Sequence, residues 1–208
     1  MDEKKSGMNG KASQLSRKEI ILTGFGGQGI VLAGRIVGEA ASLGDHREST
    51  LTQSYGPEAR GGACSAHVII SDGIIHYPYA RHPDILVCLS QGGFDKFGKL
   101  LKDDGTLITD QDLVQVGALK SENVFAIPAT RMAEELGRKM MANIVMLGFF
   151  TAVTEAVSLE AARSTVKGSV PRGTEELNLT AFNKGYEYGL AVLKGRRKKA
   201  AGEKGARG

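Results

Sequence analysis

The chain has 208 residues, 41% of them hydrophobic, which is enough for one domain with a sizeable core and scarcely enough for two. Its formal net charge of +4 is unevenly spread. Residues 194–208 hold seven Lys/Arg and one Glu, a balance of +6, and residues 1–19 hold five basic and three acidic side chains, a balance of +2. Residues 20–193 therefore carry −4, which argues against a nucleic acid or a membrane as a partner of the folded part.

Cys64 and Cys88 are the only cysteines, and they form no CxxC pair. We expect two buried, reduced thiols rather than a disulfide, an iron–sulfur cluster or a zinc site. The four histidines also lack the paired spacing of metal ligands, so no metal site is predicted. The polar N-terminus lacks the apolar segment of a secretory signal, and the apolar run 140–154 is shorter than the roughly 20 residues of a membrane-spanning helix. A soluble, cytoplasmic protein is expected.

The N-terminal half alternates between short apolar runs and glycine-rich breaks. Residues 1–18 are polar and aperiodic, which predicts a disordered leader. The pattern then predicts a buried strand at 19–23, a helix from 30 to Gly44, a strand at 47–52, a loop at 52–62, and a strand at 66–71 that turns at Gly73 into a hairpin with 74–77.

The C-terminal half begins with strands and ends in helices. Strands are predicted at 84–90, 106–109 and 124–127, and helices at 94–101, 131–139 with Thr130 as its cap, 140–157, 159–166 and 174–193. The helix at 140–157 is hydrophobic almost all round, which indicates burial on most sides. We expect a single α/β domain at 19–194, with a mostly parallel or mixed sheet covered by helices on both faces and a helical C-terminal part, followed by a basic disordered tail at 195–208.

A Rossmann-like glycine turn joins the first strand to the first helix. Gly24, Gly26 and Gly29 satisfy GxGxxG, Gly27 adds a further glycine, and Gln28 places a neutral amide at the helix start. Glycines permit a turn that a Cβ would obstruct, and the helix N-terminus offers free N–H groups to an anion. The turn is therefore a candidate anion or cofactor site, although glycines needed only for close packing of the helix on the sheet would give the same pattern.

A dinucleotide site would also require an acidic residue at the end of the second strand, about 20 residues further on. Asp45 falls before that strand and Glu48 falls inside it. The motif is incomplete for NAD, and an autonomous dinucleotide-binding oxidoreductase remains only an alternative.

The loop SYGPEARGG at 54–62 is the second candidate site. Pro57 stiffens it, and the flanking glycines, with Gly61 and Gly62 on one side, let it fold tightly while it displays Tyr55, Glu58 and Arg60. Glu58 and Arg60 could be a solvated pair, could bind a phosphate or carboxylate, or could dock a partner chain. A non-enzymatic partner-binding module is thus a further alternative.

Catalytic motifs are not evident. No GxSxG elbow, Walker A lysine or cysteine nucleophile motif is found, and no catalytic residue is assigned. Asn143 lies inside the apolar helix and needs a hydrogen-bond partner if it is buried. It could reach the glycine turn or bond within the core.

The residues also resemble a known family. GFGGQG entering IVLAGRIVGEAA, TQSYGPEARGG, PDILVCLSQ, IPAT, AN-x-VMLG and VPRGTEELNL occur in the order found in the gamma subunit of 2-oxoacid:ferredoxin oxidoreductases. The likeness covers roughly residues 19–194. Phe25 and the GTEELN segment are most similar to the 2-oxoglutarate type, whereas pyruvate-type subunits more often carry Arg at the position of Phe25.

The resemblance implies a multi-subunit enzyme that oxidatively decarboxylates a 2-oxoacid with thiamine diphosphate, forms an acyl-CoA and passes electrons to ferredoxin. Thiamine diphosphate, Mg and the iron–sulfur clusters would belong to partner subunits, namely alpha, beta and a ferredoxin-like delta, with coenzyme A as co-substrate. The glycine turn and the loop at Tyr55–Gly62 would face the catalytic interface. A pyruvate, branched-chain or indolepyruvate substrate stays open.

Overall fold

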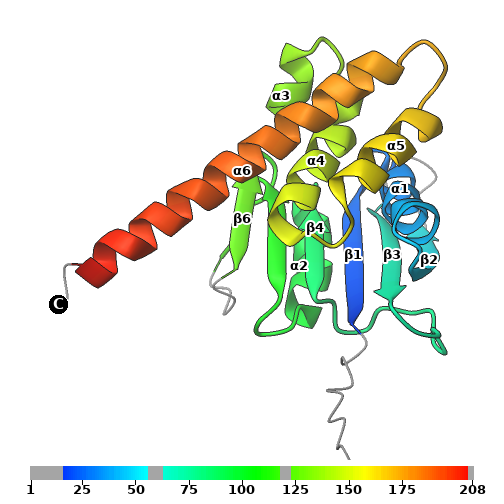
Figure 1. The fold of residues 1–208 in the computed structure, drawn as a ribbon, viewed down its shortest axis with the longest axis horizontal. Coiled ribbons are helices and arrows are strands. Elements are labelled where there is room, and N and C mark those ends of the chain that lie inside the picture. The colour runs from blue at the N-terminus through cyan, green and yellow to red at the C-terminus, as the bar shows by residue number, and fades with distance from the viewer. Residues whose placement is uncertain (1–15, 56–62, 118–122, 206–208) are drawn as a thin grey trace, which may run out of the picture.

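The computed structural model describes residues 16–55, 63–117 and 123–205, with side chains up to 201. A six-stranded mixed sheet with strand order β2-β3-β1-β4-β5-β6 forms its centre (Figure 1). The strands are β1 Arg17–Phe25, β2 Glu48–Tyr55, β3 Ala63–Ser71, β4 Ile85–Cys88, β5 Thr106–Asp110 and β6 Val124–Ile127. β1, β4, β5 and β6 are parallel, whereas β3 runs antiparallel to both of its neighbours, β1 and β2.

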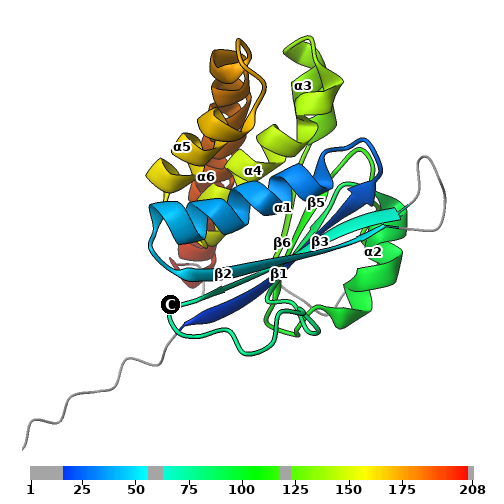
Figure 2. The ribbon, with the colours of Figure 1, turned by 90° about the vertical axis from the view of Figure 1, so that its right-hand side faces the viewer.

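Helices cover both faces of the sheet unequally (Figure 2). One face carries α1 Ile30–Glu39, α3 Ala129–Glu135, α4 Ala142–Thr154, α5 Leu159–Ser169 and α6 Glu175–Gly205, and the other carries α2 Gln91–Phe97. The larger hydrophobic core lies under the first group, and a smaller core around Ile21, Leu86 and Phe97 lies under α2. The predicted α/β class, mixed sheet and two covered faces are confirmed.

α4 is the buried centre of the helical layer, as its all-round hydrophobicity predicted, because its residues 142–152 are buried. α6 crosses it at very short range. A Cβ on Gly185 would overlap the carbonyl oxygen of Val145, and a Cβ on Gly148 would overlap that of Phe182. Glycine is therefore required on both helices where they cross.

Three local predictions differ from the structure. The segment 74–77 forms no strand, because β3 lies between β2 and β1 and so has both edges occupied. The predicted loop at 52–62 is wrong for its first part, since β2 continues to Tyr55 by pairing with β3. The remainder of that loop lies outside the described residues. Thr130 does not cap its helix; it lies inside α3 and bonds to Asp110 instead.

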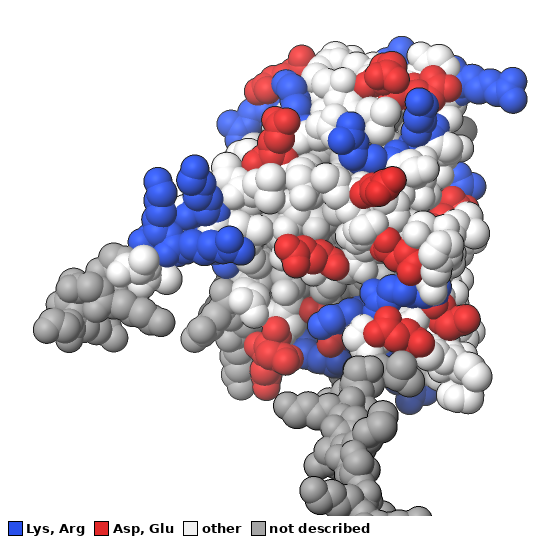
Figure 3. Space-filling view, in the orientation of Figure 1, with Lys and Arg blue, Asp and Glu red and all other residues white. Residues whose placement is uncertain are grey.

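The boundaries of the predicted leader and tail also differ from the structure. β1 begins at Arg17, inside the predicted leader, because it pairs with Ser71. α6 continues to Gly205, where a disordered tail was predicted from 195. Its far end extends past β6, away from the rest of the domain (Figure 1). Figure 3 shows a group of basic side chains there, whereas acidic and basic side chains are mixed over the body. Within the described ranges, no helix has the length and apolar character needed to cross a membrane.

Candidate functional site at the carboxyl edge of the sheet

The neighbouring parallel strands β1 and β4 send their following helices to opposite faces of the sheet, α1 to one and α2 to the other (Figure 2). Ligands of open α/β sheets bind in the crevice outside the carboxyl ends of two such strands. We call this side of the sheet, with the glycine turn at 24–29, the end of β2 and the starts of α2, α3 and α4, the carboxyl edge. It is the candidate functional site.

The glycine turn is tight, and two of its glycines are closely packed by their surroundings. A Cβ on Gly24 would collide with the side chains of Gln28 and Ile30. Gly29 is the N-cap of α1 at φ 70°, and a Cβ there would collide with Asn143. Gly27 has φ 94° and open space around it, so glycine is favoured there by the backbone conformation and not by packing. Close packing thus accounts for Gly24 and Gly29, while the N-terminal N–H groups of α1 have no side-chain cap.

Gln28 uses both ends of its amide inside the protein. Its Oε1 accepts a hydrogen bond from the Phe25 N–H at 2.6 Å, and its Nε2 donates to the Leu89 carbonyl at 3.0 Å. The first bond closes the turn, and the second fastens it to the residue after β4. Gln28 is therefore a positioning residue that holds the turn against β4.

Asn143 holds the same turn from the helical layer. Its side chain is 3% exposed, its Nδ2 donates to the Gly29 carbonyl at 3.2 Å, and its Oδ1 accepts from the Ile144 N–H at 2.9 Å. Both roles left open by the sequence are confirmed, because Nδ2 reaches the glycine turn and Oδ1 bonds within the core at the start of α4. The turn is thus fixed by Gln28 on one side and by Asn143 on the other.

The described residues on either side of 56–62, in the second candidate segment and just after it, lie at this edge. Tyr55 pairs with Cys64 and Cys64 pairs with Gly24, so the three form one row across β2, β3 and β1. Ala63, which follows the loop, pairs with Phe25. The pairing therefore brings Tyr55 and Ala63, which flank residues 56–62 in the sequence, to the glycine turn. Four predicted site residues, Glu58, Arg60, Gly61 and Gly62, lie outside the described residues.

The carboxyl edge exposes apolar side chains. Tyr55 is 64% exposed and Phe25 is 46% exposed. Met140, in the short 3-10 helix just before α4, is 79% exposed, and it lies three residues before the Asn143 that contacts Gly29. Exposed aromatic and methionine side chains beside a fixed turn are typical of a surface that another protein covers.

The sequence did not reveal one anchor of this edge. Asp110, at the end of β5, is fully buried, and its Oδ2 accepts from the backbone N–H of Thr130 at 2.8 Å and from its hydroxyl at 2.6 Å. Its Oδ1 accepts from the Asp112 N–H at 3.0 Å. Asp110 therefore ties α3 to β5. An aspartate directly after a buried strand was the only signal, and its partner is 20 residues away.

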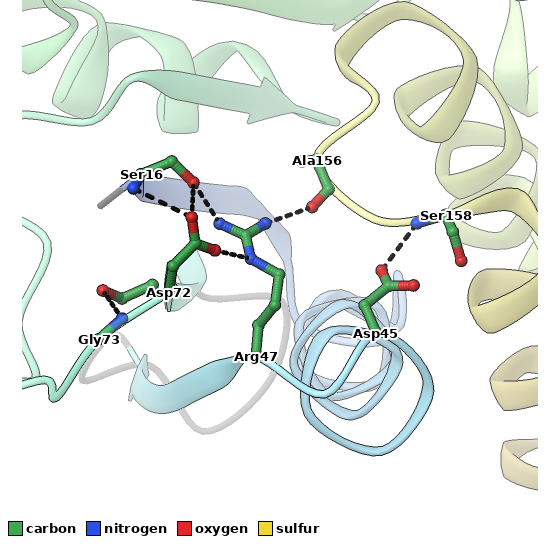
Figure 4. A network of polar contacts seen from close by, with 8 residues as sticks. Ser16, Asp45, Arg47, Asp72, Gly73, Ala156 and Ser158 are labelled. Atoms are coloured by element: carbon green, nitrogen blue, oxygen red, sulfur yellow. Dashed lines mark hydrogen bonds and ion pairs between the residues drawn. The ribbon is translucent and has the colours of Figure 1, made fainter. Parts of the chain in front are cut away.

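The carboxylates considered for a dinucleotide lie at the opposite edge. Glu48 pairs with Ser71, which pairs with Arg17 at the start of β1, far along the strand from Gly24. Asp45 accepts from the Ser158 N–H at 2.8 Å (Figure 4). The second strand thus brings no acid to the glycine turn.

A polar network fixes that opposite edge (Figure 4). Arg47 donates to Asp72 at 2.6 Å, to Ser16 at 2.7 Å and to the Ala156 carbonyl at 3.3 Å. Ser16 also donates to Asp72, through its backbone N–H and its hydroxyl. These bonds from Ser16 and Arg47 lower the pKa of Asp72. The network joins the starts of β1 and β2 to the end of β3 and to the connection between α4 and α5.

The cysteines do not form a metal site in the described ranges. Both are free and buried, as predicted, and burial raises the pKa of each thiol. They lie on different strands, β3 and β4, and no group of metal-ligating side chains occurs in the part of the chain that the structure describes. The described residues therefore do not fit an iron–sulfur cluster.

Comparison with known proteins identifies the family. Residues 19–188 match the pyruvate ferredoxin/flavodoxin oxidoreductase family. A 2-oxoglutarate synthase subunit, KorC, from Methanocaldococcus jannaschii is 53% identical over 174 residues, which cover 82% of this chain and 93% of the relative. A pyruvate synthase subunit, PorC, from Methanothermobacter thermautotrophicus is 36% identical over 174 residues, 81% of this chain and 94% of the relative.

A solved structure agrees with these relatives. The gamma subunit of a keto/oxoacid ferredoxin oxidoreductase from Geobacter sulfurreducens has a TM-score of 0.75 and 43% identity, covering 84% of this chain and 99% of that one. The chain belongs to the pyruvate ferredoxin/flavodoxin oxidoreductase family. Its fold matches that gamma subunit, which confirms the resemblance seen in the sequence.

Proposed function

We propose that this chain is the gamma subunit of a multi-subunit, thiamine-diphosphate-dependent oxidoreductase that converts 2-oxoglutarate to succinyl-CoA with electron transfer to ferredoxin. The carrying observation is the 53% identity with a subunit named for 2-oxoglutarate synthase, over nearly the whole relative. The 36% identity with a pyruvate synthase subunit is weaker support for the same chemistry with pyruvate as the substrate.

The geometry supports a role in shaping a shared active site. The carboxyl edge offers a turn fixed by Gln28 and Asn143, uncapped N–H groups at the start of α1, and exposed Phe25 and Tyr55. Such a surface can pack on another subunit and present N–H groups to an anionic part of a bound molecule. Thiamine diphosphate would supply the carbanion chemistry in a neighbouring subunit. This chain would help to shape and close the active site around it.

The partners follow from this role. Alpha and beta subunits and a ferredoxin-like delta subunit or domain would hold the thiamine diphosphate, Mg and clusters, coenzyme A would be the co-substrate, and the enzyme would work in the cytoplasm. The glycine turn at 24–29 and the loop from Tyr55 to Gly62 are proposed to face coenzyme A or the thiamine diphosphate subunit. No residue of this chain is proposed as acid, base or nucleophile.

An omission experiment tests the proposal. The chain is co-expressed with the other subunits of its enzyme, and reduction of methyl viologen is measured with coenzyme A and each of 2-oxoglutarate, pyruvate, 2-oxoisovalerate and indolepyruvate. We expect activity with 2-oxoglutarate that disappears when this chain is omitted. Full activity without the chain contradicts the subunit role, and preference for another 2-oxoacid contradicts the substrate assignment.

An autonomous dinucleotide enzyme is the alternative from the sequence. The position of Glu48 at the wrong edge of the sheet argues against it. Saturable binding of NAD(H) or NADP(H) by the isolated chain would favour it, and titration of the chain with each cofactor measures that directly.

A further inference from the structure

The end of α6 carries a set of cations that the domain does not use. Lys194, Arg197, Lys198 and Lys199 are all exposed, and no ion pair involves them among the residues whose side chains are described. We call these four residues the basic end. Figure 3 shows basic side chains gathered where α6 leaves the body, without acidic ones among them.

The basic end is held in place by a neighbouring residue. Arg196 lies over the Phe125 ring, with its Cζ 3.8 Å from the ring centroid, and its Nη2 donates to the Val124 carbonyl. Because this contact fixes α6 on β6, the cations on either side of Arg196 are held in a defined position. A fixed array of charge loses less conformational freedom on binding than a flexible tail does.

The spacing of the cations is unfavourable for a helix in isolation. Lys194 and Lys198 are four residues apart, and Lys194 and Arg197 are three apart, so like charges face each other along one side. An anionic partner removes this repulsion. The basic end of α6 is therefore more favourable when an anionic partner is bound than when it faces water.

An apolar groove lies beside these cations. It has a volume of about 580 Å³, and Leu190, which is 47% exposed, lines it with Leu193 and Ala201. Lys194, Arg197 and Lys198 line it too, together with the single carboxylate of Glu155. An apolar floor with a charged rim is typical of a protein–protein contact. The apolar floor packs against the partner, and the charged rim attracts and orients it.

The charge distribution favours a compact acidic protein over RNA or a membrane. Residues 20–193 carry −4, so an extended polyanion or an anionic membrane plane would be repelled by the body beyond the basic end. Glu155 on the rim repels phosphates and carboxylates alike, so the apolar floor of Leu190, Leu193 and Ala201 is what favours a protein that also offers an apolar spot. A contact surface rimmed by three cations suits a transient, electrostatically steered encounter of the electron-transfer type.

The position of the basic end suits such an encounter. The family match ends at residue 188, before the basic end begins, so these cations lie outside the matched domain. The end of α6 that carries them extends past β6, whereas the carboxyl edge lies at the end of the sheet where α3 stands (Figure 1). A second protein can therefore reach them while other subunits cover the carboxyl edge.

We propose that the basic end and its groove dock an acidic electron-carrier protein, the ferredoxin that accepts electrons from the assembled enzyme. This inference rests on the proposed function, because only an enzyme that exports electrons needs such a carrier.

The experiment compares two charge reversals of equal size in the assembled enzyme. One variant carries Lys194→Glu, Arg197→Glu and Lys198→Glu; the control carries Arg163→Glu, Lys167→Glu and Lys184→Glu, three exposed cations on the body. Turnover is measured with a purified acidic two-cluster ferredoxin and with methyl viologen, at about 50 and about 300 mM salt. We expect the KM for ferredoxin to rise roughly tenfold in the first variant at low salt, with a smaller effect at high salt, and viologen turnover to be unchanged.

Two results overturn the proposal in this assay. An unchanged KM for ferredoxin, or an equal rise in the control, shows that the basic end does not dock the carrier. Loss of assembly in the first variant alone shows that it binds another subunit instead.

A titration that needs no turnover separates this inference from the proposed function. Oxidised ferredoxin is added to the isotope-labelled full chain, and backbone amide shifts are followed by NMR. Shifts concentrated at 190–201 support docking, and their absence overturns it. Tighter binding of poly(U) RNA, or of vesicles with roughly 30% phosphatidylserine, than of ferredoxin at the same salt also overturns it. A wild-type assembly that reduces no viologen with any 2-oxoacid contradicts the proposed function, whatever the titration shows.

Discussion

Replacing Asn143 by Ala tests whether the helical layer holds the glycine turn. The change removes the bond from Nδ2 to the Gly29 carbonyl and the bond that Oδ1 accepts from the Ile144 N–H. Gly29 keeps a partner, because its carbonyl also accepts from the Ala33 N–H at 2.9 Å. The Ile144 N–H, near the start of α4, loses its side-chain acceptor in a buried place.

The magnitude follows from these two bonds. Each contributes about 1 kcal/mol, and the small cavity left by a side chain only 3% exposed adds to the loss, so the free energy of unfolding should fall by about 2–3 kcal/mol. For a chain of this length the melting temperature should fall by roughly 5–10 °C. Urea unfolding followed by circular dichroism measures the free energy, and calorimetry measures the melting temperature.

Two further variants make the test specific. Asn183→Ala, at a half-buried position of α6, is the matched control and should cost less than about 0.5 kcal/mol. Asn143→Asp keeps the acceptor for Ile144 but turns a second oxygen toward the Gly29 carbonyl, so it should cost at least as much as Asn143→Ala. If Asn143→Ala costs no more than Asn183→Ala, the turn does not depend on Asn143 and the reasoning fails.

Three other predictions follow from single contacts. Gly185→Ala should lower the free energy of unfolding by about 1–3 kcal/mol in urea, because its Cβ overlaps the Val145 carbonyl, whereas Gly195→Ala, with open space around it, should be neutral or slightly stabilising. Because the pKa of Asp72 is lowered in the folded state, its carboxylate stabilises the fold above the usual aspartate pKa near 4. This stabilisation is lost as pH falls through the lowered folded pKa. The free energy of unfolding of Asp72→Asn should therefore depend less on pH below about pH 4 than that of the unchanged protein. Burial raises the pKa of Cys88, so iodoacetamide at about pH 8 should label it only after denaturation, and rapid labelling of the native chain would contradict its burial.

The sequence predicted those elements whose pattern is set by burial. The strand at 124–127 and the buried helix around α4 were correct because their buried residues, Phe125 and Ile127 of the strand among them, lie in the larger core. The end of β2 was not predictable in the same way, since Thr52, Gln53 and Ser54 are polar and only their pairing with β3 makes them a strand. The hairpin at 74–77 failed for a related reason, because local alternation cannot show that both edges of β3 are occupied.

The features of the candidate site were likewise predictable only where the signal is local in the sequence. Gly24 and Gly29 were found because a glycine turn has a local signature, and Asn143 was found because a polar residue in an apolar helix needs a partner. The bond of Gln28 to the Leu89 carbonyl spans 61 residues, and that of Asp110 to Thr130 spans 20. Such contacts depend on strand order, which the sequence pattern does not give.

Strand order also explains why the glycine turn here is not a nucleotide site of the usual kind. In the dinucleotide fold the second strand lies beside the first and delivers its acid at the carboxyl edge. Here the antiparallel β3 lies in that place, and its Cys64 stands between Tyr55 of β2 and Gly24 of β1 in one row. The place beside the first strand that would deliver a ribose-binding acid is occupied by the start of β3, where Ala63 pairs with Phe25 of the glycine turn. The same glycine motif therefore serves a different purpose here, because β3 is inserted beside β1. This arrangement favours a surface that a second subunit completes.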